Sequence, residues 1–145
     1  MTQQNPTVVV VGLGYIGLPT AAVLASAGAQ VTGIDVKDST IEAVNNGEVP
    51  FVEPDLGTVL AGAVKQGRLS AQKDIPHAQN YIIAVPTPFK GDHEPDLSYI
   101  EDAARKIAPQ LEGDELVILE STSPPGATEH LSLIHISEPT RQEAI

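Results

Sequence analysis

Three glycines near the N-terminus have the spacing of a turn that binds phosphate groups. Gly12, Gly14 and Gly17 follow the apolar residues 8–11 in a G-x-G-x-x-G pattern. The first glycine permits a tight turn after a strand, the second lets the backbone approach a pyrophosphate, and the third lets the next helix pack on the sheet. The N-terminus of that helix offers free N–H groups and partial positive charge to an anion. The pattern therefore predicts a dinucleotide-binding turn.

A carboxylate follows where such a turn requires one. Asp35 ends the segment 30–35, which is predicted to be the second strand, roughly 20 residues after the glycines. Its oxygens can accept hydrogen bonds from the adenosine ribose and would repel a 2′-phosphate, which favours NAD over NADP. Lys37 is a weaker signal in the opposite direction. The alternative, in which Asp35 only stabilises a turn or caps a helix, stays open.

Two further polar segments follow predicted buried strands. Residues 84–89 (AVPTPF) contain two prolines that fix the direction of Thr87, and residues 120–128 (ESTSPPGAT) are rich in hydroxyl groups. In open α/β sheets, ligands bind at the carboxyl ends of the strands. Hydroxyl groups there can hold a phosphate, a ribose or an ordered water. Ordinary loop chemistry explains the same composition, because loops are built from these residue types.

The elements that must position these residues alternate between strand and helix. Strands are predicted over residues 7–11, 30–35, 68–71, 81–85 and 116–119. Helices are predicted over 15–27, 38–44 and 55–66 and after Asp96, with Asp38 or Ser39, Asp55 and Asp96 as N-caps. This order predicts an α/β fold, a Rossmann-type doubly wound parallel sheet with right-handed crossovers.

Composition restricts the class of protein. The chain has 145 residues, 41% of them hydrophobic, and a formal net charge of −11, which suits one soluble domain. The acidic balance argues against nucleic acid and anionic membranes as partners. Without cysteine the chain has no disulfide or thiolate metal site, and its four histidines lack metal-ligand spacing, so no metal is expected. The cytoplasm is the expected compartment.

The polar segments and the glycine turn together resemble the UDP-glucose/GDP-mannose dehydrogenase family. The matching stretches are residues 11–19 (VGLGYIGLP), 84–88 (AVPTP) and 120–122 (EST). Residues 89–99 and 119–124 most resemble the members that oxidise UDP-N-acetyl-D-mannosamine to UDP-N-acetyl-D-mannosaminuronate for bacterial surface polysaccharides. The resemblance implies an enzyme that oxidises the C6 hydroxyl of a nucleotide sugar to a carboxylate, using two NAD.

The resemblance also implies roles for single residues. Backbone groups of Tyr15 and Ile16 match positions on the cofactor pyrophosphate, and Asp35 matches the ribose acid. The hydroxyl groups of Thr87 and Thr128 match groups that contact NAD. Thr122 matches a threonine near the reacting centre that helps to hold the hydrolytic water, and it is the expected catalytic residue.

The family's covalent chemistry depends on residues that the resemblance places beyond residue 145. A cysteine forms a thiohemiacetal and then a thioester, and a lysine stabilises oxyanion charge, both near a second α/β domain that holds the nucleotide sugar. The expectation is therefore an NAD-binding fragment, incomplete at the C-terminal end of its sheet. We expect it to be inactive alone, marginally stable and weaker in NAD binding than a full-length form, which is expected to be a homodimer.

The last segment has a different character. Residues 131–141 (LSLIHISEPTR) match the conceptual translation of a transposase-derived sequencing adaptor at every position. The expected organisation is a partial NAD-binding domain over residues 1–130 and a non-native tail over residues 131–145. A natural frameshift or a divergent C-terminus is the alternative.

Two other functions stay open at this point. One is another NAD-linked dehydrogenase with the same type of cofactor domain, such as a hydroxy-acid enzyme, although the segments around Thr87 and Thr122 argue against it. The other is a stand-alone NAD-binding or regulatory module. NAD binding does not separate that module from an enzyme fragment, because both predict it.

Overall fold

The protein folds around one parallel sheet. The computed structural model describes residues 5–90 and 94–121. Its helices are α1 (Gly17–Ser26), α2 (Asp38–Asn45), α3 (Leu56–Lys65) and α4 (Ser98–Ile107), the last continued by a short 3-10 turn, Ala108–Gln110. Its strands are β1 (Thr7–Val11), β2 (Gln30–Ile34), β3 (Leu69–Gln72), β4 (Asn80–Ile83), β5 (Phe89–Lys90), β6 (Glu94–Pro95) and β7 (Leu116–Leu119).

Five of these strands pair in the order β3-β2-β1-β4-β7, and all four pairings are parallel. The central strand β1 lies between β2 and β4, with Val9 opposite Thr32 on one side and Tyr81 on the other. The chain therefore builds outward in one direction up to β3 and then crosses back to begin again at β4. This reversal confirms the predicted doubly wound, Rossmann-type sheet and creates a switch point between β1 and β4.

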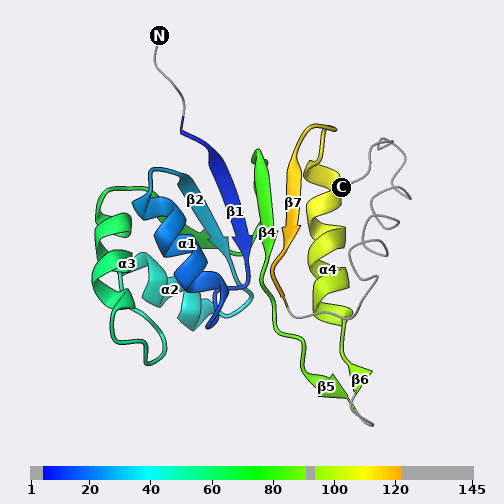
Figure 1. Cartoon of the computed structure of the whole chain (residues 1–145), viewed down its shortest axis with the longest axis horizontal. Helices are drawn as coiled ribbons and strands as arrows, with labels where there is room; N and C mark the ends of the chain where they lie inside the picture. Colours follow the sequence, from blue (N-terminus) through cyan, green and yellow to red (C-terminus); the bar gives the residue numbers. More distant parts are fainter. Residues whose placement is uncertain (1–4, 91–93, 122–145) are drawn as a thin grey trace.

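The alternation of side chains along β1 explains why both faces of the sheet are covered. Val8 and Val10 are buried in a cluster with residues of α1, α2 and α3. Val9 and Val11 are buried in a second cluster with residues of α4. Successive side chains of a strand point to opposite faces, so a continuous valine run requires cover on both. Figure 1 shows α1, α2 and α3 beside β2 and β1, and α4 beside β7.

Glycines follow three of the helices. Gly28, Gly47 and Gly67 follow α1, α2 and α3 with φ angles of +113°, +75° and +75°. A residue in this left-handed region closes a helix with little steric cost only when it has no Cβ. The helix α4 buries Ile100, Ala104 and Ile107 on one apolar stripe.

The predicted N-caps are less accurate than the predicted helix bounds. No side chain caps α2 or α3, so capping by Asp38, Ser39 or Asp55 is wrong. Asp38 instead pairs with Lys73, with Oδ1 2.8 Å from Nζ. Asp96 does accept a hydrogen bond from the backbone N–H of Ser98 at 3.0 Å. A cap depends on side-chain rotamer and on competing partners, which residue type alone does not specify.

Two features were not predicted. The strands β5 and β6 form a short antiparallel pair that projects beyond the carboxyl end of β4 (Figure 1). At the opposite edge, the amide of Asn45 pairs with β3, accepting from the N–H of Ala71 at 2.8 Å and donating to its carbonyl at 3.0 Å. Asn45 thus occupies an edge position where another strand would pair.

No helix within residues 5–90 and 94–121 is long and apolar enough to cross a bilayer.

Candidate cofactor site

The carboxyl ends of the four adjacent strands β2, β1, β4 and β7 are tied together. Beyond the ladder, Gly12 N–H donates to the Ile34 carbonyl at 2.7 Å, and Ala84 N–H donates to the Val11 carbonyl at 2.8 Å. Ser121 N–H donates to the carbonyl of Ile83 at 3.2 Å. These bonds bring segments that are distant in sequence to one edge of the sheet. The glycine loop crosses this edge at the switch point.

The three glycines of the loop meet different surroundings. Gly12 has a φ of +100°, and a Cβ there would lie 2.5 Å from the carbonyl oxygen of Ala84. A Cβ on Gly17 would overlap the carbonyl oxygen of Gly12. A Cβ on Gly14 would meet no atom within 4 Å. Gly12 and Gly17 are therefore required by the fold, whereas nothing in the fold of the described residues explains Gly14.

The helix that follows the loop has a free N-terminus. No side chain caps α1, and its first turn contains no acidic residue. In the described part of the chain, no group accepts a hydrogen bond from the backbone N–H of Tyr15, Ile16 or Gly17. The exposed fractions of Tyr15 and Ile16 are 72% and 49%. Open donors at the positive end of a ten-residue helix fit a bound anion.

Asp35 is already engaged with the backbone on both sides. Its Oδ2 accepts from Leu13 N–H at 3.1 Å, within the glycine loop, and its Oδ1 accepts from Lys37 N–H at 2.9 Å. Asp35 therefore stabilises the turn, as one of the two alternatives from the sequence expects. Each carboxylate oxygen keeps a second acceptor site for a ribose hydroxyl. The binding role stays a prediction.

The other predicted site residues are placed only in part. Thr87 is half-buried in the segment that leaves β4, between two exposed prolines. Thr122 and Thr128 lie outside the described residues, so their predicted roles stay untested. The structure thus gathers the glycines and Asp35 at one sheet edge, while Thr87 lies in the segment between β4 and β5.

Two contacts at this edge were missed by sequence reasoning. The ring of Tyr15 lies on that of Phe51, with centroids 4.5 Å apart, so the link between α2 and α3 supports the glycine loop. Glu120 directly follows β7 and accepts a hydrogen bond from the hydroxyl of Thr20 on α1 at 2.8 Å. Neither pairing has a sequence signal, because the partners are 36 and 100 residues apart.

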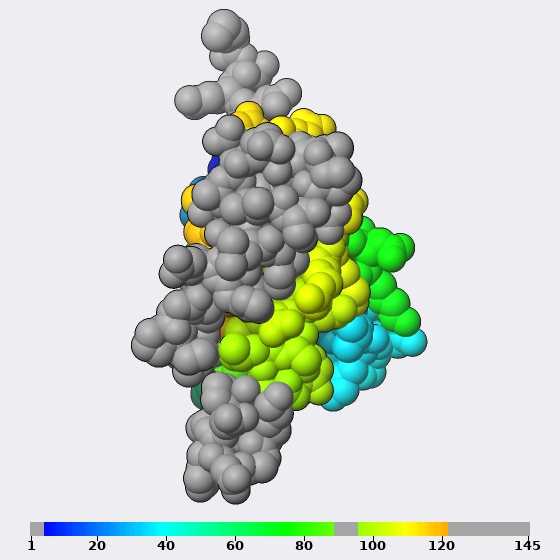
Figure 2. Space-filling model, turned by 90° about the vertical axis from the view of Figure 1, so that its right-hand side faces the viewer, coloured from blue at the N-terminus to red at the C-terminus, as the bar shows by residue number. Residues whose placement is uncertain are grey.

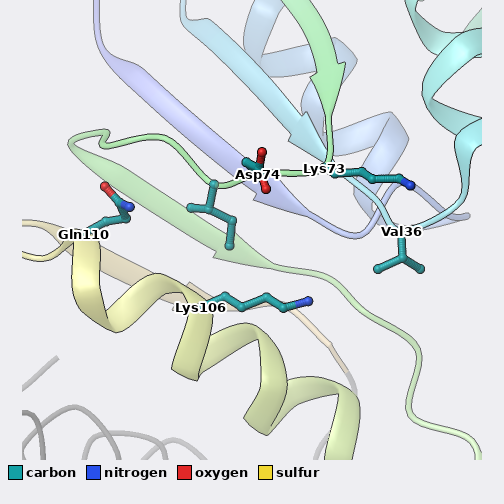
Figure 3. A pocket seen from close by; sticks show the side chains of 6 residues that line it. Val36, Lys73, Asp74, Lys106 and Gln110 are labelled. Carbon is teal, nitrogen blue, oxygen red and sulfur yellow. The ribbon is translucent and has the colours of Figure 1, made fainter.

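A pocket opens beside Asp35, between the loop after β3 and the exposed side of α4. Figure 3 shows Val36 at its rim and the chains of Lys73 and Lys106 along it. Both ammonium groups are paired, Lys73 with Asp38 at 2.8 Å and Lys106 with Asp102 at 3.0 Å. The hydrogen bond to Asp38 raises the pKa of Lys73. Both cations are thus paired with exposed carboxylates, and such surface pairs contribute little stability.

One group of possible metal ligands lies away from this edge. His77, Glu112 and Glu115 offer ligand atoms within 4.8 Å of one another. The carboxylate of Glu115, however, accepts hydrogen bonds from the backbone N–H groups of Glu112 and Gly113 at 2.8–2.9 Å. These hydrogen bonds close the turn before β7, and this structural role explains why the side chains cluster.

Comparison with known proteins decides the family. Residues 6–144 match the profile of the UDP-glucose/GDP-mannose dehydrogenase family, NAD binding domain. The chain belongs to this family. It is an NAD-binding domain of Rossmann type, and the resemblance noted in the sequence is confirmed.

Relatives with two different substrate names match equally well. UDP-N-acetyl-D-mannosamine dehydrogenase of Escherichia coli K12 is 55% identical over 126 residues. NDP-N-acetyl-D-galactosaminuronic acid dehydrogenase of Ralstonia nicotianae is also 55% identical over 126 residues. Each alignment covers 87% of this chain and 30% of the relative. The chain therefore spans about a third of the length of these relatives.

Solved structures agree with the fold. UDP-D-ManNAc dehydrogenase from Pyrococcus horikoshii superposes with a TM-score of 0.89 at 37% identity, covering 95% of this chain and 34% of that one. GDP-mannose dehydrogenase from Pseudomonas aeruginosa, solved as a ternary complex, gives a TM-score of 0.86 at 28% identity, covering 94% and 34%.

Proposed function

We propose that this chain holds NAD for an enzyme that oxidises the C6 hydroxyl of UDP-N-acetyl-D-mannosamine to the carboxylate. The pyrophosphate would lie over Gly14 at the free N-terminus of α1, accepting from the N–H groups of Tyr15 and Ile16. The adenosine ribose would donate to Asp35. When bound, NAD supplies the hydride acceptor. The residues of this chain bind and orient it.

One observation carries this proposal. Gly14 adjoins open space. The backbone N–H groups of the next two residues, Tyr15 and Ile16, have no acceptor among the described residues. A glycine that the fold does not require, beside a helix end without a cap, is explained by a ligand that approaches the backbone. The roles of Thr87, Thr122 and Thr128 belong to this proposal as well, with Thr122 holding water near the reacting carbon.

The covalent steps are proposed to belong to the rest of the relatives' length. The chain contains no cysteine, so it supplies no thiolate nucleophile of its own. A nucleotide-sugar domain, a homodimer and a cytoplasmic location are part of the same proposal for the full-length protein. UDP-N-acetyl-D-mannosamine is favoured over other nucleotide sugars by the likeness of residues 89–99 and 119–124, which the equal identity of the two relatives does not decide.

Calorimetric titration with NAD and NADP tests the cofactor proposal. The chain is expected to bind NAD more tightly than NADP, and Asp35→Asn is expected to weaken NAD binding roughly ten- to a hundredfold, because it removes a charged hydrogen bond worth about 1.5–3 kcal/mol. Glu42→Gln on the exposed side of α2 is the matched control for the loss of one charge. Unchanged affinity and preference in Asp35→Asn would refute the ribose role.

The tail is a separate proposal. We infer that residues 1–130 are the natural part of a partial NAD-binding domain and that residues 131–145 derive from adaptor sequence. The family match extends to residue 144, so similarity alone does not separate the two parts. Long-read sequencing of the source DNA through the codons for Thr128 to Leu133 tests it. A reading frame that continues into a second α/β domain supports an enzyme, whereas a genomic stop after this tail supports a stand-alone NAD-binding module.

A further inference from the structure

The carboxylate of Glu120 lies on the opposite side of the glycine loop from Asp35. Glu120 is the first residue after β7, and Asp35 is the first residue after β2. The strands β1 and β4 lie between them in the sheet. Two acidic residues thus flank the switch point, each at the carboxyl end of a strand.

NAD has a matching layout, with one ribose on each side of its pyrophosphate. If the pyrophosphate lies at the N-terminus of α1 and the adenosine ribose lies at Asp35, the second ribose extends toward β4 and β7. The residues that directly follow β4 are Ala84 and Val85, neither of which can accept from a ribose through its side chain. At the carboxyl ends of β4 and β7, Glu120 is the acidic residue among those described.

The geometry leaves Glu120 able to accept from a ribose. Its backbone N–H donates to the Ile83 carbonyl at 2.9 Å, which fixes the residue at the end of β7. The Oε1 atom accepts from the hydroxyl of Thr20 at 2.8 Å, and Thr20 shares that one proton with the carbonyl oxygen of Ile16 at 3.0 Å. The contact directs the Glu120 side chain toward the first turn of α1. Among the described residues, no donor is bonded to Oε2. The neighbouring Ser121 hydroxyl is already used, since it donates to Ile83 at 3.2 Å.

We propose that Glu120 accepts hydrogen bonds from the hydroxyl groups of the nicotinamide-side ribose, and that Thr20 is a positioning residue that aims this carboxylate. The proposal rests on the proposed binding of NAD at the glycine loop. It pairs the two carboxylates with the two riboses of one ligand, Asp35 with the first and Glu120 with the second.

Binding of three ligands distinguishes a role of Glu120 in ribose binding from a purely structural role, in which its hydrogen bond to Thr20 only connects α1 to the end of β7. ADP ends at the pyrophosphate, ADP-ribose adds the second ribose, and NAD adds the nicotinamide. Glu120→Gln is expected to weaken binding of ADP-ribose and NAD about tenfold, as loss of a hydrogen bond to a charged group implies. Binding of ADP should stay the same or become slightly tighter, because a negative charge near the phosphates is removed.

Ligand binding by variants of Thr20 is the second measurement. Thr20→Val is expected to reproduce part of the loss for ADP-ribose and none for ADP, whereas Thr20→Ser, which keeps the hydroxyl, should bind as the original chain does. Glu42→Gln is the control for charge, and thermal unfolding confirms that each variant is folded.

The outcomes are distinct. If Glu120→Gln binds ADP-ribose as tightly as the original chain, or loses ADP and ADP-ribose affinity equally, the ribose role is wrong while NAD binding stands. If the original chain binds none of the three ligands, the proposed function falls and this inference falls with it.

Discussion

Substitution of Gly14 by alanine separates a turn that binds a cofactor from a turn that only connects two elements. A Cβ at this position would meet no atom within 4 Å, and Gly14 is not among the glycines with positive φ. The folded chain should therefore accept the methyl group. Its unfolding free energy should change by less than about 0.5 kcal/mol, or rise by about 0.4–1 kcal/mol because alanine restricts the unfolded chain.

The effect on NAD should be large by comparison. The added methyl group would occupy the space through which a pyrophosphate approaches the N–H groups at the start of α1. Loss of one hydrogen bond to a charged phosphate costs about 1.5–3 kcal/mol. The expected result is NAD affinity weaker by about ten- to a hundredfold in a protein of unchanged stability.

Gly12→Ala is the contrasting variant. The φ of +100° and the 2.5 Å approach to the Ala84 oxygen would both be unfavourable. The backbone conformation alone costs about 1–3 kcal/mol outside glycine, and the overlap adds to it. This variant should lose stability first and binding only as a consequence.

The assay is urea unfolding of both variants together with calorimetric titration of NAD. If Gly14→Ala binds NAD as the original chain does, with its stability unchanged, Gly14 does not face the pyrophosphate and the argument from open space is wrong. If Gly14→Ala unfolds, the description of its surroundings is wrong instead.

Three other predictions concern stability. Asn45→Ala should lower the unfolding free energy by about 1–2 kcal/mol in urea titration, because two hydrogen bonds to Ala71 at the edge of β3 are lost; no change would mean that water replaces the amide. Tyr81→Phe should cost about 1–3 kcal/mol in the same assay, because the buried hydroxyl accepts from one backbone group and donates to another; a neutral result would contradict those bonds. Burial acts to raise the pKa of Glu115, but hydrogen bonds from the backbone N–H groups of Gly113, Glu112 and Glu115 itself, together with nearby His77, outweigh it and hold that pKa below its usual value. The stabilisation from Glu115 is therefore present above a pH of about 4.3 and lost as the pH falls through the lower folded value; Glu115→Gln should flatten this part of the curve of unfolding temperature against pH, and an unchanged slope would refute the assignment.

Local patterns predicted the elements well because each depends on neighbours in the chain. The continuous valine run of β1 reflects burial on both faces of the sheet, and the apolar stripe on α4 reflects burial at the period of a helix. The helix stops at Gly28, Gly47 and Gly67 follow from the one residue type that adopts positive φ freely. The caps expected at Asp38 and Asp55 failed because a carboxylate has several possible partners, and for Asp38 the partner is Lys73 from the loop after β3.

The surface around α4 also combines contacts that the sequence predicts with a pocket that it does not. Figure 2 shows part of the outer side of α4 in yellow-green. On this helix Arg105 pairs with Glu101 at 3.7 Å and Lys106 with Asp102 at 3.0 Å. Such pairs at i and i+4 are local and can be expected from the sequence. The pocket beside this helix is not local, since Val36, Lys73 and Lys106 come from three separate segments.

The sequence by itself determined the class of fold, the cofactor and the family, because the glycine turn, Asp35 and the segments after β4 and β7 are short motifs read in chain order. Only the tertiary structure decided which of these residues the fold requires. It showed that Gly12 and Gly17 meet backbone atoms while Gly14 meets open space, and that Asp35 accepts hydrogen bonds from Leu13 in the glycine loop and from Lys37. It also joined Thr20 to Glu120 across 100 residues. The physical reason is that sterics and hydrogen bonds act between atoms close in space, and a parallel sheet brings residues together that are far apart in the chain.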